Sequence, residues 1–394
     1  MKRFLFPIRP QPSRLGPLGA CAYLAGFALP FEWDIPLALL ALSGSLALAT
    51  CGRNGPAARW PLALPVLVFS LVGGLSILLS EDIGRSARLS AAWLPAALLF
   101  FLIAGYFRDL RHTRRLYLTF SLVGLGLASV LLWTAGQNGW AVSRHWASQV
   151  GSPIFIVTND SAFLAVIAPL SLALFYRAPR SVEGVLAALS ILLSIGAVCM
   201  LRSRVAMLTV MVSLTCAAVL MRPRRGFIWG VGILSLALLV DGLLGFPLAA
   251  KFRHVWDGES GRLRDGRLWV WSAAWAMFRE APWWGHGPHT FTYTTVDGIT
   301  MTWVHNLYLE ALAEQGLVGL AALGFLLVSG VSAGWNVQRA ALGEARILGA
   351  GALAGLIGFG CAALFELSFL RQWVVIILFA LLGVVAQLAA TKQR

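Results

Sequence analysis

The stretch WVHNLYLEALAEQGLVGL, residues 303–320, joins a polar sequence to the start of a long apolar run. A run of that kind predicts a membrane-spanning helix, which would normally begin with anchoring aromatic residues. Here the run is preceded instead by His305, Asn306, Glu310 and Glu314. At helical spacing Asn306 and the two glutamates share one stripe, and His305 begins the neighbouring stripe.

An imidazole at the water-accessible start of a helix has the chemistry of a general base. Its pKa lies near neutrality, so it can take a proton from a hydroxyl group. The alternative is an interfacial polar residue, which is the more common role for a lone histidine at a span entrance. The polar residues that accompany His305 favour the first interpretation.

The composition of the chain is that of a membrane protein. Of its 394 residues, 58% are hydrophobic and 12% are charged, and the mean hydropathy is +0.77. Soluble globular domains contain about 25% charged residues, so this chain lies outside that class. A helix crosses a bilayer with roughly 17 to 25 apolar residues. The sequence predicts twelve such spans, near 16–31, 35–51, 61–80, 89–107, 116–135, 160–176, 184–201, 205–221, 226–245, 316–335, 347–364 and 372–390.

The net charge of +14 is distributed in short clusters between the expected spans. This pattern excludes a nucleic-acid-binding face or tail and fits the excess of Lys and Arg in cytoplasmic loops. With the N-terminus in the cytoplasm, 19 of the 31 Lys and Arg residues lie on the cytoplasmic side. We therefore expect both termini in the cytoplasm and the long segment 242–304 on the outer side.

The first span is expected to remain uncleaved, because the LGAC sequence at 18–21 precedes the apolar run that a lipoprotein cleavage box should follow. The five cysteines fall in or at the edge of expected spans and show no paired spacing, so no disulfide framework is implied.

The segment 242–304 is the longest connection in the chain and is rich in Trp, Gly and His. Loops of this length are usually functional. Within it, RLWVWSAAWAMFRE places Leu268, Trp271, Trp275 and Phe278 at helical spacing, and the following APWWGHGPHTF carries proline and glycine stop signals. We expect an amphipathic helix at the membrane–water boundary, anchored by its tryptophans.

Two groups of arginines on the outer side suit an anionic ligand. Arg202 and Arg204 lie in a very short connection between spans, where an ionisable group is usually functional or paired. The alternative is that they mark the helix ends by extending to the surface. Arg262, Arg264 and Arg267 lie among glycines before a helix, which favours phosphate binding, although a solvated basic loop fits equally.

Other chemistries fit the sequence less well. No His, Cys and Asp cluster has metal-ligand spacing, and no nucleotide-binding glycine loop or nucleophilic serine turn is present. The pair Glu81 and Asp82, in an expected outer loop, could hold a metal, with a solvated loop as the alternative. We expect no metal and no cofactor.

Taken together, these motifs resemble a known family. GRLWVWSAAWAMFREAPWWGHGPHTF, followed after a short gap by VHNLYLEALAEQGLVGL, is similar to the signature of the O-antigen ligase and polymerase superfamily: an arginine–tryptophan helix, a proline–glycine turn, and His-Asn opening a helix that ends in Glu-x-Gly-x-x-Gly. RSRVA resembles the serine–arginine motif of the same family. Many members carry His-x-His-Asn, whereas Trp303 stands at the first of these positions here.

The resemblance implies an all-α, GT-C-like membrane glycosyltransferase of the bacterial inner membrane with its active site on the periplasmic side. The donor would be an undecaprenyl-diphosphate-linked glycan, the acceptor a sugar hydroxyl of lipid A–core, and the partners otherwise membrane lipids. His305 would be the base, with Asn306 and Glu310 in support. Arginines would hold the diphosphate: Arg204, Arg264, Arg267, Arg202 and Arg262.

The motifs do not separate a ligase from a polymerase or a protein O-glycosyltransferase, and the compact size with one dominant loop favours the ligase. A flippase or transporter would explain the spans without catalysis, but its ionisable groups should lie near mid-membrane. Here they lie at the outer edge, as do Glu366 and Arg371. The expected organisation is helices 1–9 over 1–241, the periplasmic loop over 242–304 and helices 10–12 over 305–394.

Overall fold

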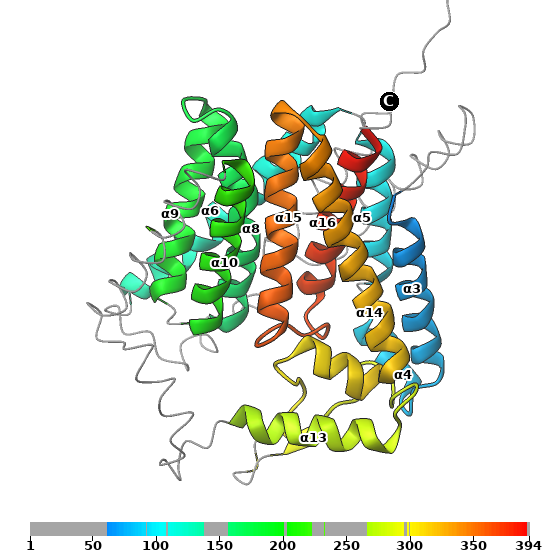
Figure 1. Ribbon diagram of the computed structural model, residues 1–394. Coiled ribbons are helices and arrows are strands. Elements are labelled where there is room, and N and C mark those ends of the chain that lie inside the picture. Colours follow the sequence, from blue (N-terminus) through cyan, green and yellow to red (C-terminus); the bar gives the residue numbers. More distant parts are fainter. Residues whose placement is uncertain are drawn as a thin grey trace, which may run out of the picture.

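The computed structural model is a bundle of long helices with a smaller layer of chain packed across one end (Figure 1). It describes residues 61–91, 93–107, 109–137, 157–200, 203–222, 266–294 and 300–391, together with Gly232 and Gly298. The long helices are α3 (Ala63–Leu78), α5 (Trp93–Tyr106), α6 (Leu110–Gln137), α8 (Val157–Arg177), α9 (Val182–Met200), α10 (Arg204–Met221), α14 (Leu307–Ala340), α15 (Gly343–Ala363) and α16 (Gln372–Thr391).

The end layer is made of shorter elements. Helices α4 (Ile83–Leu89) and α13 (Gly266–Glu280) belong to it, together with a hairpin of two short strands, β1 (Tyr293–Thr294) and β2 (Thr300–Met301). The strands pair antiparallel, with Tyr293 opposite Met301. The helix expected within 267–280 is therefore confirmed, and Arg267 lies in its first turn. The sequence analysis does not predict the hairpin.

The helices have the lengths and composition of a multi-pass membrane protein. Six stretches of the described chain are long and apolar enough to cross a bilayer. The three expected spans near 16–31, 35–51 and 226–245 lie outside the described residues, so the count of twelve and the division at 241 and 304 stay predictions. The six stretches are Ile83–Gly105, Leu110–Gln137, Val182–Met200, Leu307–Ala340, Gly343–Ala363 and Trp373–Ala390.

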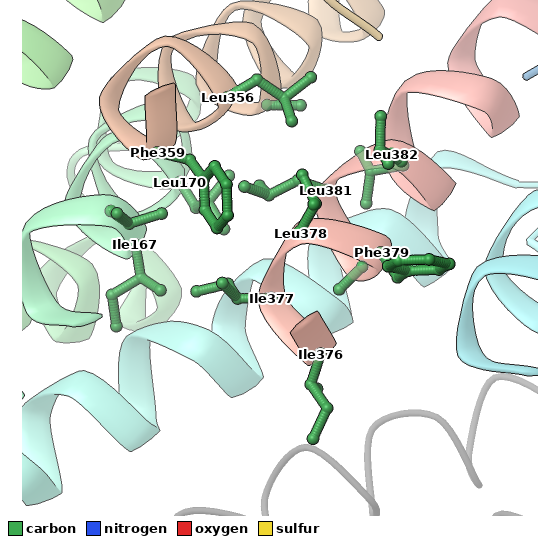
Figure 2. Packing of buried hydrophobic residues seen from close by; sticks show 14 of the residues in the cluster. Ile167, Leu170, Leu356, Phe359, Ile376, Ile377, Leu378, Phe379, Leu381 and Leu382 are labelled. Carbon is green, nitrogen blue, oxygen red and sulfur yellow. The ribbon is translucent and has the colours of Figure 1, made fainter. Parts of the chain in front are cut away.

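Helix α16 lies in the core of the bundle and is apolar on every side, as a helix without a water-facing surface must be. Figure 2 shows that Ile377 and Leu381 of α16 point toward side chains of α8 and α15, whereas Ile376 and Phe379 point away from them. Ile167 and Leu170 of α8 and Phe359 of α15 are among its buried neighbours. This packing fixes the connection between α15 and α16, which leads into the end layer.

Small residues let the helices around this core approach closely. A Cβ atom added to Gly351 of α15 would lie 3.0 Å from the carbonyl oxygen of Pro169, and one added to Gly355 would lie 3.4 Å from that of Val166. Small residues at interfaces are characteristic of packed membrane helices because the backbones can come together. The fit holds α15 directly against α8.

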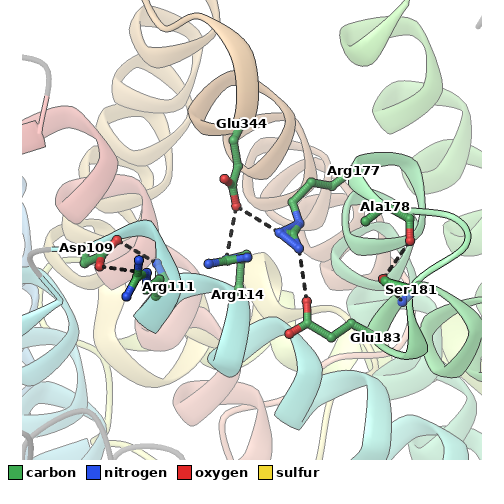
Figure 3. Close-up of polar contacts among 9 residues, drawn as sticks. Asp109, Arg111, Arg114, Arg177, Ala178, Ser181, Glu183 and Glu344 are labelled. Atoms are coloured by element: carbon green, nitrogen blue, oxygen red, sulfur yellow. Dashed lines mark hydrogen bonds and ion pairs between the residues drawn. The ribbon is translucent and has the colours of Figure 1, made fainter.

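At the opposite end of the bundle from α13, charged residues tie several helices together (Figures 1 and 3). Arg177 at the end of α8 lies 3.3 Å from Glu183 of α9 and 3.4 Å from Glu344 of α15. Arg114 of α6 lies 3.2 Å from the same oxygen of Glu344. The sequence analysis predicts arginines of this kind on the cytoplasmic side, and the side of the membrane that this end faces stays a prediction.

Candidate active site

Helix α13 packs across the end of the bundle through a small apolar stripe. Val270 and Ala274 are fully buried against Phe291, Val304 and Ala313, which lie in the turn after α13, before α14 and in the first turns of α14. The spacing of the two α13 residues is one helical turn, so they lie on one face. This contact fixes α13 relative to the start of α14.

The tryptophans of α13 do not share one role. Trp275 is 49% exposed and suits the expected anchor at the membrane–water boundary. Trp271 instead is partly buried, and its Nε1–H donates to the carbonyl oxygen of Val304 at 3.1 Å. The expectation that the tryptophans of this helix all serve as anchors is therefore wrong for Trp271, which holds the chain just before His305.

The proline–glycine turn after α13 packs against α14 at a break in that helix. Gly316 has φ 66°, and the amides of the next two residues donate to the carbonyl oxygens of Pro282 and Trp283 instead of to their own helix, with N···O distances of 2.9 and 3.2 Å. A Cβ on Gly316 would lie 2.3 Å from the Trp283 carbonyl oxygen. Glycine is required here both by the backbone angle and by this approach.

Glu314, just before the break, binds the turn from the other side. Its buried carboxylate accepts hydrogen bonds from the backbone amides of His289 and Phe291 at 2.8 and 3.2 Å. The Glu-x-Gly part of the motif is thus a device for docking the turn onto α14. His289 itself is 2% exposed, and burial, followed by the charge of Arg85, lowers its pKa to about 4.

Glu310 has an equivalent role toward the α15–α16 connection. Its buried carboxylate accepts hydrogen bonds from the Oγ of Ser368 and from the amide of Phe369, both at 2.9 Å. Glu310 therefore holds the loop that carries Glu366, and its supporting role in catalysis stays a prediction.

Glu81 and Asp82 have partners within the protein. Glu81 lies 2.6 Å from Nδ1 of His286, whose Nε2 donates to the carbonyl oxygen of Met277 at 3.0 Å. Burial lowers the pKa of His286, but the two hydrogen bonds and the carboxylate charge outweigh burial and raise it overall. Asp82 caps α4 by accepting from the amide of Arg85. In the part of the chain that the structure describes, no group of three or more His, Cys, Asp or Glu could hold a metal ion.

His305 lies outside the helix that the sequence suggested. Helix α14 begins at Leu307, and Asn306 caps it by accepting from the amides of Tyr308 and Leu309 at 3.1 and 3.0 Å. His305 has φ 57°, in the left-handed region, so it cannot share a helical stripe with later residues. The expected stripe through His305 is wrong, because the cap residue directs the preceding chain away from the helix axis.

The imidazole of His305 faces a buried carboxylate. Its Nδ1 lies 3.6 Å from Glu366, and the other carboxylate oxygen of Glu366 lies 3.1 Å from Arg267 of α13. Glu366 is 4% exposed, whereas the Arg267 side chain is 35% exposed. Three residues from separate segments thus form one polar cluster at the end of the bundle.

The indole of Trp303 lies against the same imidazole. Its Nε1 lies 2.6 Å from Nε2 of His305 and 3.2 Å from Nδ1, and the two rings meet nearly edge to face. The guanidinium carbon of Arg371 lies 4.9 Å from the centre of the Trp303 ring, within the range of a cation–π contact. Arg371 and Glu366 both come from the connection between α15 and α16.

The part of the chain that the structure describes places none of the other predicted arginines in this cluster. Arg202, Arg262 and Arg264 lie outside those residues. Arg204 begins α10, whose first turn is capped by Ser203, but the position of the Arg204 side chain is not described.

Glu366 was the residue whose role the sequence analysis missed. It is a carboxylate between two apolar spans, and an ionisable residue in that position is usually paired or functional. Its sequence position predicts a place at the outer edge of the membrane. It does not identify the partners of Glu366, because His305 and Arg267 come from other segments.

The fold and this cluster define a class: a multi-pass α-helical membrane protein with a histidine–carboxylate–arginine site at one end of the bundle. Residues 189–324 match the family model described as O-Antigen ligase. This match covers 136 of the 394 residues and bears out the resemblance inferred from the motifs. This family groups membrane glycosyltransferase-like enzymes, both ligases and polymerases. No curated protein matches the chain.

Proposed function

We propose that this protein is an O-antigen ligase, which transfers a glycan from undecaprenyl diphosphate to a sugar hydroxyl of lipid A–core. The observation that carries the proposal is the cluster of His305, Glu366 and Arg267. His305 and Arg267 lie inside the matched segment, and Glu366 lies beyond its end. The cluster supplies a base, a group that orients the base and a cation at one point of the protein.

His305 would act as the general base through Nε2. The nitrogen takes the proton of the acceptor hydroxyl while the oxygen attacks the anomeric carbon of the donor sugar, and the bond from that carbon to the diphosphate breaks. Undecaprenyl diphosphate leaves with the bonding electrons. Attack from the face opposite the leaving group gives inversion.

Glu366 would orient and stabilise the base. A carboxylate 3.6 Å from Nδ1 favours the tautomer with the proton on Nδ1, and it stabilises the imidazolium that forms as the acceptor loses its proton. Glu310 would support this arrangement indirectly, because it holds the connection that carries Glu366. Asn306 would support it by capping α14 directly after His305.

The leaving diphosphate needs positive charge. Arg267 uses one Nη atom for Glu366 and has further donors, and its exposed fraction leaves it accessible to a ligand. We assign it to the diphosphate together with Arg204 and Arg264, and with Arg202 and Arg262 in lesser roles. Planar guanidiniums bind phosphate oxygens in pairs, so no metal is required to neutralise the leaving group.

The proposed setting is the bacterial inner membrane, with both termini in the cytoplasm and the segment 242–304 in the periplasm. The charged cluster around Arg177 and Glu344 would then face the cytoplasm. The lipid-linked donor reaches the site from the membrane, and the acceptor hydroxyl reaches it from water, so the two meet at the boundary where His305 lies.

Reconstitution of the purified protein with a lipid-linked glycan tests this proposal. The glycan is offered with either lipid A–core or a second lipid-linked repeat as acceptor. A product on lipid A–core alone supports the ligase. Extension of the lipid-linked repeat would identify a polymerase, transfer to a protein acceptor would identify a protein O-glycosyltransferase, and movement of the donor across the bilayer without transfer would identify a flippase.

A further inference from the structure

Helix α3 is short for a helix that faces lipid. Its exposed leucines lie at helical spacing and form one stripe: Leu64, Leu67, Leu71, Leu75 and Leu78. The 16 residues of α3 make about 24 Å of helix, whereas the hydrocarbon core of a bilayer is about 30 Å thick. A lipid-facing surface of full thickness must therefore continue beyond α3.

Several segments meet at the C-terminal end of α3. The chain turns there into α4, and the proline–glycine turn after α13 packs against it, because the amide of Glu81 donates to the carbonyl oxygen of His286 at 3.0 Å. The same turn meets α14 at Leu317, whose amide donates to the carbonyl oxygen of Pro282. The ends of α3 and α4, the turn and α14 thus lie together at one corner of the bundle (Figure 1).

Large apolar side chains are exposed at this corner. Trp283 of the turn is 66% exposed, and Ile83 of α4 is 51% exposed. With their exposed neighbours they form what we call the corner patch: Leu78, Leu79, Ile83, Trp283, Trp284 and Leu317. Exposed charged residues border the patch at Glu81, Asp82 and Arg88. An apolar patch with a polar rim marks an interaction surface, and indoles favour the boundary between acyl chains and headgroups.

We propose that the corner patch is a lipid-binding surface, embedded in the leaflet on the α13 side at the level where acyl chains meet headgroups. The patch continues the leucine stripe of α3, because Leu78 belongs to both. It also continues the exposed stripe of α14, in which Leu317, Phe325 and Val328 lie on one face. Both neighbouring surfaces face lipid, so phospholipid is the partner that covers the patch between them.

An embedded corner sets the depth of the candidate site. The turn that carries Trp283 also binds the carboxylate of Glu314, near the start of α14, through the amides of His289 and Phe291. The polar cluster around His305 then lies close to the level of the lipid headgroups. Given the proposed function, the diphosphate of a membrane-bound donor lies at the same level.

Photo-crosslinking from lipid tests the patch on the wild-type protein. The purified protein is placed in liposomes that contain a phosphatidylcholine with a diazirine on its acyl chain, either close to the headgroup or at the chain end. Peptide mass spectrometry maps the labelled residues. The probe close to the headgroup should label Trp283 and Ile83, and the chain-end probe should shift the label to Leu71 in the middle of α3. Thr294, an exposed polar residue of the hairpin, should stay unlabelled with both probes.

Matched variants give the second measurement. Ile83→Asp places a charge in the corner patch and should reduce the labelling of Leu79 and Trp283 by the probe close to the headgroup, whereas Thr294→Asp should leave it unaltered. Labelling of Leu71 without Trp283 and Ile83 would overturn the proposal, and a dimer in the same liposomes would then identify a second copy as the cover. Unchanged labelling in Ile83→Asp would also overturn it. No substrate is present, so failure of the transfer assay would refute the proposed function and leave this inference standing.

Discussion

Replacing Glu366 with glutamine removes one charge at the centre of the candidate site and keeps its shape. The carboxylate lies 3.6 Å from Nδ1 of His305, and two unit charges at about that distance interact by about 4–5 kcal/mol at an effective dielectric constant of about 20. We take about half of this value, because water screens the partly exposed imidazole and Arg267 pairs with the same carboxylate. About 2 kcal/mol then remains to stabilise the imidazolium, which corresponds to about 30-fold in rate.

The assay is single-turnover transfer by the purified variant with saturating donor, normalised to the folded fraction. Glu314→Gln is the matched control, because Glu314 is also a buried carboxylate but accepts only from backbone amides of the turn. It should lower thermal stability and leave turnover per folded molecule near the wild-type value. Turnover of Glu366→Gln within 2-fold of the wild type would refute the reasoning that Glu366 stabilises the base.

Three further outcomes follow from the same site. Chelators should leave activity intact, because arginine neutralises the diphosphate; loss of turnover in EDTA that Mg²⁺ or Mn²⁺ restores would make residues 81–82 metal ligands. Changing Arg204, Arg264 or Arg267 to Ala should raise the KM for the donor more than that for the acceptor, with only partial rescue by Lys; unaltered kinetics in all three would remove the diphosphate site. The pKa of His289 in the folded protein is about 4, below the ordinary 6.5, so its unfolded form binds the extra proton between these values and stability is lost as the pH falls from about 6.5 to about 4. The thermal midpoint should therefore fall more steeply over this window in the wild type than in His289→Gln, and parallel curves would contradict the assignment.

The local parts of the site could be read from the sequence. Periodicity predicts helix α13, and the proline and glycine stop signals predict its end. Hydropathy predicts the membrane helices. Each of these signals acts within a few residues. The position of Asn306 at the start of α14 can also be predicted from the sequence, because a helix cap is a local hydrogen bond.

The parts that join distant segments could not be read in this way. Glu366 meets His305 only because α16 is packed in the core and returns its connection to the end of the bundle. The carboxylates of Glu310 and Glu314 looked like a polar helix stripe, but each one binds backbone amides of another segment. The left-handed conformation of His305, just before the cap of α14, has no signal in a helical repeat.

The most direct test of the account is turnover of His305→Ala measured together with donor binding. General-base assistance contributes about 10²–10⁴-fold, so the variant should lose nearly all transfer while expression, folding and donor binding stay close to normal. His305→Gln, which can form a hydrogen bond but cannot accept the proton usefully, should be almost as inactive. Near-normal turnover of His305→Ala would make His305 an ordinary interfacial residue, and joint loss of binding and turnover would make it a ligand of the donor instead of the base.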